Sequence, residues 1–148
     1  MLRRIKPLGA SIEELLDIYD KQIRCVLEFA SPVWTSGLTL AETNQIERVQ
    51  KAAFAIILDI QYNSYAKSLT KLSRKTLTER RYDLNLNFAR KALKSEKFNH
   101  WFCEYKPTVQ VSKTRSVKDV LLVPVESRNK SFGKSPLAYL TNLINENK

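Results

Sequence analysis

Basic side chains that can bind phosphate gather in the second part of this 148-residue chain. Residues 61–148 hold 18 basic and 7 acidic residues, whereas residues 1–60 hold 7 basic and 8 acidic ones. The net charge of +10 therefore comes entirely from the second part. This asymmetry favours a polyanionic partner, of which nucleic acid is the commonest; a solvated basic surface is the alternative. The candidate phosphate-binding residues are Lys67, Lys71, Arg74, Lys75, Arg80, Arg90, Lys91 and Lys94.

Contacts between such cations and a duplex backbone give affinity and register but read no base sequence. If about five phosphates are engaged, log K should fall with log[salt] at a slope of about −4 to −5. The test is therefore the salt dependence of binding.

The chain lacks the residue combinations that most self-sufficient enzymes need. His100 is its single histidine, no two Asp residues are adjacent, and the three glycines are too scattered for a phosphate loop. Cys25 and Cys103 form neither a zinc quartet nor a disulfide framework, which indicates an intracellular, reducing environment. We predict no catalytic residue, no metal or cofactor, no small-molecule substrate and no membrane segment.

Three capping boxes, each a Ser or Thr followed three positions later by Glu, predict where helices begin. They start at Ser11, Thr39 and Thr76, and apolar residues recur at helical spacing after each. The expected long helices span residues 12–30, 40–58 and 77–94, with a short helix at 65–72. The predicted fold is an all-α bundle of three long helices plus one or two short ones.

The helical faces give further expectations. In the first helix, Asp17/Lys21 and Asp20/Arg24 form surface ion pairs four residues apart, and Pro32 ends the helix. In the third, Arg81 alone among the cations falls in the apolar sector, where it either snorkels to solvent or pairs with a carboxylate. The main apolar stripe of the second helix comprises Ile46, Val49, Ala53, Ile56 and Ile57. The basic face of the third comprises Arg80, Arg90, Lys91 and Lys94, with Asn87 among them.

The pattern weakens after residue 105. Residues 31–38 are expected to be a loop, 108–111 a short strand, and 136–144 a last weak helix. We therefore predict a helical bundle over residues 1–105 and a basic, weakly structured, loosely attached tail over residues 106–148.

Two stretches carry a resemblance to a known family. They are Gln22–Trp34, with Val-Leu-Glu-Phe-Ala before Val-Trp, and Ile46–Leu58, with Ile-Glu-Arg-Val-Gln-Lys-Ala. In this order they resemble the region that follows the polymerase palm in jockey-like reverse transcriptases (RNA-directed DNA polymerases) of non-LTR retrotransposons. The resemblance covers residues 1–102 and, more weakly, 132–146.

The resemblance implies that the chain is the thumb and C-terminal region of such a polymerase, a helical bundle that holds the template–primer duplex. The metal-binding carboxylates of the family lie upstream in the palm, so Met1 would be an internal methionine of the parent. The fragment would therefore not be an enzyme on its own. The alternative function is a non-catalytic helical protein-interaction module with a basic surface. An independent helix-turn-helix DNA reader is weaker, because the first two helices and their connection are too long.

Overall fold

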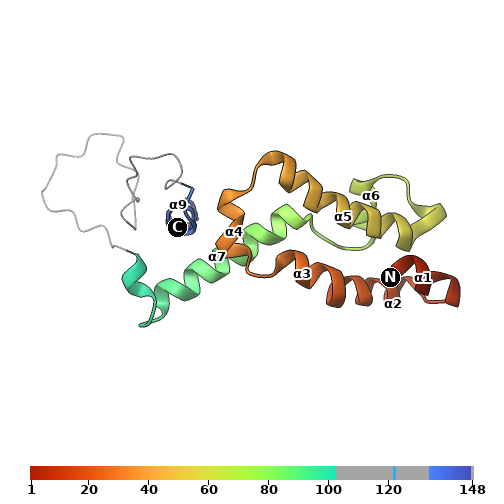
Figure 1. The fold of residues 1–148 in the computed structure, drawn as a ribbon, viewed down its shortest axis with the longest axis horizontal. Helices are drawn as coiled ribbons and strands as arrows, with labels where there is room; N and C mark the ends of the chain where they lie inside the picture. The colour runs from red at the N-terminus through yellow and green to blue at the C-terminus, as the bar shows by residue number, and fades with distance from the viewer. Residues whose placement is uncertain (103–121, 123–133, 148) are drawn as a thin grey trace, which may run out of the picture. The chain divides into compact units, whose positions relative to one another are not determined.

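The computed structural model describes residues 1–102, 122 and 134–147, and the elements in this part of the chain are helical (Figure 1). The all-α prediction is thus confirmed. The predicted strand at 108–111 lies outside the described residues. No helix in the described part is long and apolar enough to cross a membrane. The α-helices are α1 (Leu2–Ile5), α2 (Ile12–Ile18), α3 (Cys25–Glu28), α4 (Ser31–Trp34), α5 (Leu40–Leu58), α6 (Tyr65–Lys71), α7 (Leu77–Lys94) and α9 (Pro136–Glu146).

All three predicted capping boxes are present. The hydroxyl oxygens of Ser11, Thr39 and Thr76 each accept from the backbone N–H three residues on, and the Glu at that position accepts from the cap's own N–H. The backbone hydrogen bond to the Glu is the largest cause that lowers the pKa of both Glu14 and Glu42. These local bonds explain why α5 and α7 begin where the sequence predicts.

The first long helix differs from the expectation because a π-helical segment, Tyr19–Arg24, lies between α2 and α3. A π-turn adds a residue to the helical repeat and rotates the downstream face. Val26, which the apolar stripe places inside, is 70% exposed. The side chains of Asp20 and Glu28, expected on the solvated face, are only 14% and 11% exposed.

The end of this helix is also earlier than predicted. Phe29 has an extended ψ of 130° and Ala30 a left-handed φ of 52°, so the chain leaves the helix before Pro32. Pro32 lies instead in the first turn of α4, where its missing N–H costs little. The predicted loop at 31–38 is therefore wrong: it contains α4 and a 3-10 turn, Thr35–Gly37.

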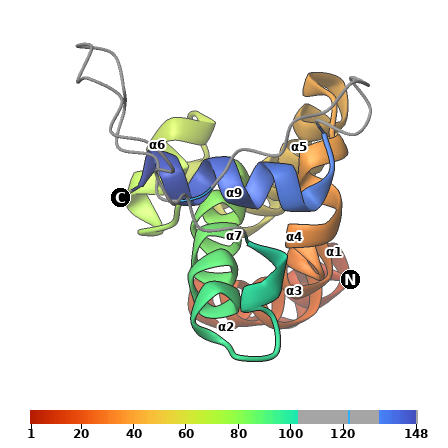
Figure 2. The same cartoon turned by 90° about the vertical axis from the view of Figure 1, so that its left-hand side faces the viewer.

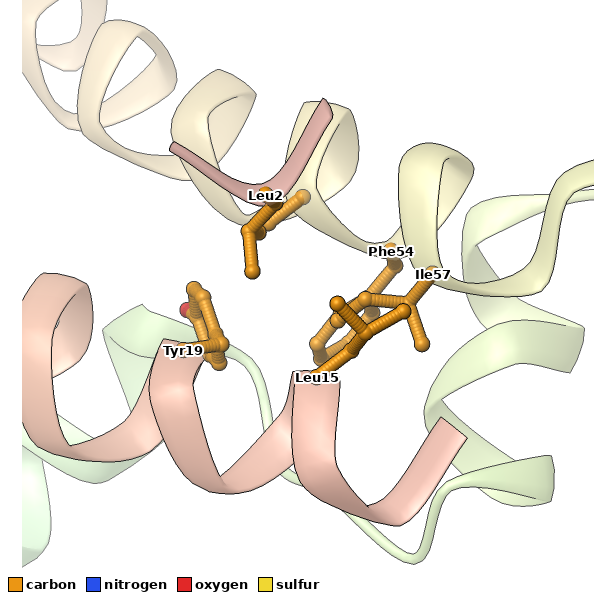
Figure 3. Close-up of a cluster of buried hydrophobic side chains, with 6 residues drawn as sticks. Leu2, Leu15, Tyr19, Phe54 and Ile57 are labelled. Carbon is orange, nitrogen blue, oxygen red and sulfur yellow. The ribbon is translucent and has the colours of Figure 1, made fainter. Parts of the chain in front are cut away.

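The chain divides into two compact units, each with its own buried core. Unit 1 comprises Met1–Ser31 and Leu38–Arg81. Its core joins α1, α2 and α5, and Figure 3 shows the side chains converging. Phe54 is fully buried at its centre and meets the Tyr19 ring edge to face, with ring centroids 5.5 Å apart. The buried members are Leu2, Leu15, Tyr19, Ala53, Phe54 and Ile57.

The buried face of α5 is rotated from its predicted stripe. Ala53 and Ile57 are buried as expected, but Val49 is 40% exposed. Two polar residues, Glu47 and Gln50, take the inward positions instead. Hydrogen bonds, described below, compensate these two side chains for the loss of water.

Unit 2 comprises Pro32–Gly37 and Tyr82–Lys148, and α9 crosses α7 within it (Figure 2). Leu140 and Ile144 of α9 share a buried core with Ala89 and Ala92 of α7. The division falls at Arg81, inside α7, rather than at residue 105. The predicted last helix at 136–144 is present as α9, which is amphipathic, capped by Ser135 and packed, whereas most of the rest of the predicted tail lies outside the described residues.

Candidate nucleic-acid interface

Three of the predicted phosphate-binding cations lie together on α7 within unit 2. Arg90, Lys91 and Lys94 are all exposed, and Asn87 is exposed beside them. None of the three cations has a carboxylate partner within the described part of the chain. Because residues three and four apart share a helix face, these side chains form one basic surface, which we call the α7 cationic face.

The opposite side of α7 is packed in the core of unit 2, so the α7 cationic face points to solvent. Ala89 is fully buried and Ala92 is 3% exposed, so their small side chains let other parts of the core approach the helix closely. Asn147, which follows α9, donates from Nδ2 to Tyr82 Oη at 2.5 Å and accepts from Arg90 Nη2 through its backbone oxygen at 3.2 Å. The end of α9 is thereby bonded to α7 and orients one of the three cations.

Arg80, the predicted first member of this basic face, has a different role. It lies in unit 1, where its guanidinium forms a two-bond ion pair with Glu28; Nη2 to Oε2 is 3.0 Å. Hydrogen bonding to Glu28 raises the pKa of Arg80. Fork-to-carboxylate geometry of this kind occupies the donors that would bind phosphate. The pairing comes from residues 52 apart in sequence, which a helical wheel of α7 alone does not reveal.

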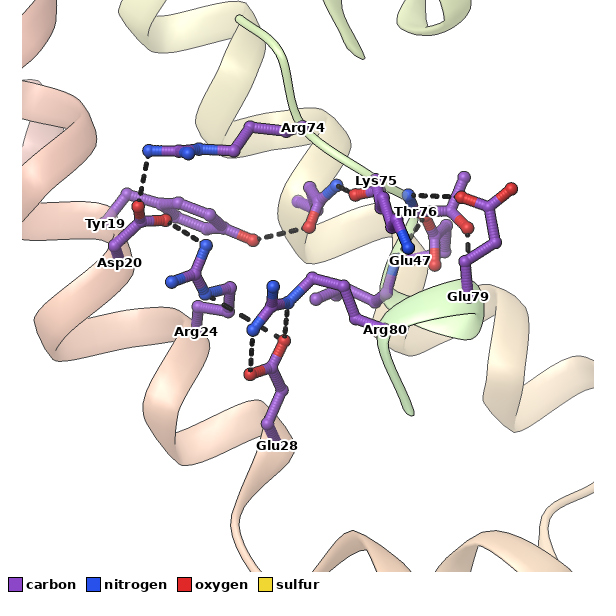
Figure 4. A network of polar contacts seen from close by, with 12 residues as sticks. Tyr19, Asp20, Arg24, Glu28, Glu47, Arg74, Lys75, Thr76, Glu79 and Arg80 are labelled. Atoms are coloured by element: carbon purple, nitrogen blue, oxygen red, sulfur yellow. Dashed lines mark hydrogen bonds and ion pairs between the residues drawn. The ribbon is translucent and has the colours of Figure 1, made fainter. Parts of the chain in front are cut away.

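Arg74 is engaged in the same way. Its Nη2 donates to Asp20 Oδ2 at 2.7 Å, and Arg24 Nη1 reaches Asp20 Oδ1 at 2.6 Å. Figure 4 shows these pairs together, so that three arginines from two parts of unit 1 alternate with two carboxylates. The predicted Asp20/Arg24 and Asp17/Lys21 pairs are present, but the first is half-buried rather than superficial.

The remaining candidates, Lys67, Lys71 and Lys75, are exposed in unit 1. Lys71 Nζ donates to Gln61 Oε1 at 2.6 Å, an uncharged partner that leaves its charge available. The backbone oxygen of Lys75 accepts from Gln50 Nε2 at 3.0 Å. The eight predicted residues therefore divide into the α7 cationic face, exposed lysines of unit 1, and two arginines committed to ion pairs.

Arg81 is only 2% exposed and donates from Nη2 to Thr78 Oγ1 at 3.3 Å, so the snorkelling alternative is wrong. Among the described residues, no group of three or more His, Cys, Asp or Glu side chains is placed to hold a metal ion. His100 is exposed and meets the Trp101 ring edge to face, at 6.3 Å between centroids.

A buried polar network in unit 1 was missed in the sequence. Tyr19 Oη donates to Gln50 Oε1 at 2.8 Å, and Gln50 Nε2 donates to Tyr65 Oη at 3.0 Å (Figure 4 shows the Tyr19 end). Tyr65 Oη in turn donates to Glu47 Oε1, which also accepts from the Leu77 backbone N–H at 3.2 Å. Burial raises the pKa of both tyrosines, which keeps them protonated as donors. The signal available in the sequence was the pair Glu47 and Gln50, two polar residues three positions apart beside the predicted apolar stripe of α5.

Replacing Arg80 with alanine should destabilise unit 1 without weakening duplex binding. Loss of the guanidinium leaves Glu28, 11% exposed, with only Arg24 at 3.9 Å. We expect a loss of about 1–2 kcal/mol in the free energy of unfolding, measured with urea. The affinity for an RNA–DNA duplex should change less than about twofold, a shift well under 1.4 kcal/mol. An Arg80→Ala protein of unchanged stability but reduced affinity would return Arg80 to the phosphate-binding set.

Comparison with models of known protein families, with curated proteins and with solved structures gave no match.

Proposed function

We propose that the chain is a thumb-like fragment of a retrotransposon reverse transcriptase and that it holds a template–primer duplex by phosphate contacts. The observation that carries the proposal is the α7 cationic face, three exposed cations with no carboxylate partner among the described residues. The resemblance of Gln22–Trp34 and Ile46–Leu58 to jockey-like polymerases supplies the class of protein. The proposal assigns no catalytic step to this chain.

The chemistry of the face suits a near-A-form RNA–DNA hybrid. Such a duplex has a wide, shallow minor groove bordered by accessible phosphates and 2′-hydroxyl groups. Arg90 can form two parallel bonds to a phosphate, and Lys91 and Lys94 act as mobile point charges. Asn87 adds a short polar side chain that can meet a 2′-hydroxyl. Contacts of this kind hold the duplex regardless of its base sequence.

The direct test replaces Arg90, Lys91 and Lys94 together with alanine. All three are exposed and alanine is a good helix former, so the fold should persist. We expect the affinity for a labelled RNA–DNA hybrid, measured by fluorescence anisotropy at fixed salt, to fall about tenfold or more, at least 1.4 kcal/mol. The loss should be the same for hybrids of unrelated sequence.

A second triple variant, with Arg3, Arg4 and Arg48 replaced by alanine, is the matched control. These arginines are also exposed and the variant removes the same charge, but from unit 1. It should keep most of the affinity. Equal losses in the two variants would mean that net charge alone attracts the duplex, and the proposed interface would be wrong.

A further inference from the structure

An apolar groove in unit 1 runs along the side of α5 that faces α1. Val49, Ala52 and Ile56 of α5 form its floor, and Met1 and Ile23 contribute its walls. Its volume is about 470 Å³, and a second hollow of about 500 Å³ continues it past Arg3, Ala52 and Ile56 toward Asp59. The groove lies within one compact unit, so its shape belongs to that unit alone.

The sequence explains why this surface is both apolar and concave. Val49, Ala52 and Ile56 occupy positions i, i+3 and i+7 of one helix, which form a continuous row along α5. Larger aliphatic side chains flank Ala52, whose methyl group leaves the row indented. Unit 1 buries the neighbouring face of α5, with Phe54 and Ile57, instead. Val49, 40% exposed, and Ala52 therefore remain on the surface, while Ile56 is partly buried against the edge of the core.

Two cations border the groove. Arg3 on α1 and Arg48 on α5 are exposed, and neither has an ion-pair partner among the described residues. The acid nearest the far end of the groove, Asp59, is already paired with Lys6 at 3.1 Å. An occupant that covers the aliphatic floor would meet uncompensated positive charge at its edges. Negative charge flanking an apolar stripe is the complementary pattern.

We propose that this groove binds an acidic amphipathic helix of a partner protein, which lays its apolar stripe on Val49, Ala52 and Ile56. The backbones of α1 and α5 are hydrogen-bonded within their own helices, so they offer no edge to which a strand could add. A helix satisfies its own backbone and binds through side chains at i, i+3 and i+7. A nucleic-acid duplex would place charged phosphates over the aliphatic floor, which is unfavourable.

The experiment uses the full chain and a fluorescein-labelled peptide of about 15 residues, roughly four helical turns. The peptide carries Leu at i, i+3, i+7 and i+10 and Glu at most other positions. It should bind at least about tenfold more tightly, by 1.4 kcal/mol, than a scrambled peptide of identical composition. Ala52→Glu places a carboxylate on the floor, in a residue type that favours helix, and should reduce affinity about tenfold or more.

Charge reversal gives a second, independent variant. The double variant Arg3→Glu/Arg48→Glu should have a lower affinity for the Glu peptide. It should have a higher affinity for a peptide that carries Lys at the same positions. The matched control is Arg4→Glu, which alters an exposed arginine of α1 outside the groove lining and should leave affinity within about twofold. Duplex binding should be unchanged in Ala52→Glu, which separates this site from the α7 cationic face.

Three outcomes would overturn the proposal. The first is equal affinity for the designed and scrambled peptides. The second is displacement of the peptide by an RNA–DNA hybrid together with loss of hybrid binding in the Arg3/Arg48 variant, which would make the groove a nucleic-acid site. The third is a dimer in sedimentation that Ala52→Glu dissociates, which would make a second copy the occupant.

Discussion

Replacing Phe54 with alanine is expected to cause the largest loss of stability in this protein, about 3–5 kcal/mol in the free energy of unfolding. Phe54 of α5 is fully buried and packs against the rings of Tyr19 in the π-helical segment and Tyr65 in α6, at 5.5 and 6.3 Å between centroids. Its removal loses apolar burial, two aromatic contacts and the support of α6. Such a loss is a large share of the roughly 5–15 kcal/mol that usually stabilises a domain.

The measurement is urea unfolding followed by circular dichroism, with amide hydrogen exchange to locate the effect in α5. Leu40→Ala is the matched control, because Leu40 is on the same helix but 78% exposed. Its effect should stay within about 0.5 kcal/mol. If the Phe54 and Leu40 variants were equally stable, the core assigned to unit 1 would be wrong.

Replacing Glu47 with alanine is expected to have the second largest effect, about 2–4 kcal/mol. Glu47 is 8% exposed, and its Oε1 accepts from Tyr65 Oη and from the Leu77 N–H, the first donor of α7. The Leu77 side chain is fully buried, so this N–H would lose its partner in a dry environment. The negative carboxylate is also stabilised by the positive N-terminal end of the α7 helix dipole.

Glu47→Gln separates these contributions, since it keeps an acceptor oxygen but removes the charge. It should lose less stability than Glu47→Ala. Glu13→Ala, which changes an exposed glutamate of the same unit, should be nearly neutral. If Glu47→Ala left the free energy of unfolding unchanged, the hydrogen bonds to Glu47 would not be needed to join α5, α6 and α7.

The parts of the fold that follow from local rules could be predicted from the sequence. The bounds of α5 and α7 depend on capping boxes and apolar spacing, both of which are encoded within a few residues. The Asp17/Lys21 pair depends only on a spacing of four. The exposure of Lys91 and Lys94 also follows from the helical period, because the opposite face carries Ala89 and Ala92.

The parts that depend on distant residues could not be predicted. Glu28 and Arg80 are 52 positions apart, and Asp20 and Arg74 are 54 apart, so their pairing requires the packing of unit 1. When the packing of unit 1 is not known, Arg74 and Arg80 look like free cations that could bind phosphate. The π-helical turn has a similar consequence: downstream of it Glu28 lies inward and Val26 outward, which regular helical spacing does not predict. The packing of α9 on α7 depends on a core formed by segments about 50 residues apart.

The salt dependence of hybrid binding tests the central claim, that the α7 cationic face contacts phosphates, most directly. The measurement is the slope of log K against log[salt] for the wild-type chain and both triple variants. Each lost phosphate contact should reduce the slope by roughly 0.9, so the Arg90/Lys91/Lys94 variant should be flatter by about 2.5–3. The Arg3/Arg4/Arg48 variant should keep the wild-type slope. A slope unchanged by the loss of Arg90, Lys91 and Lys94 would contradict the account.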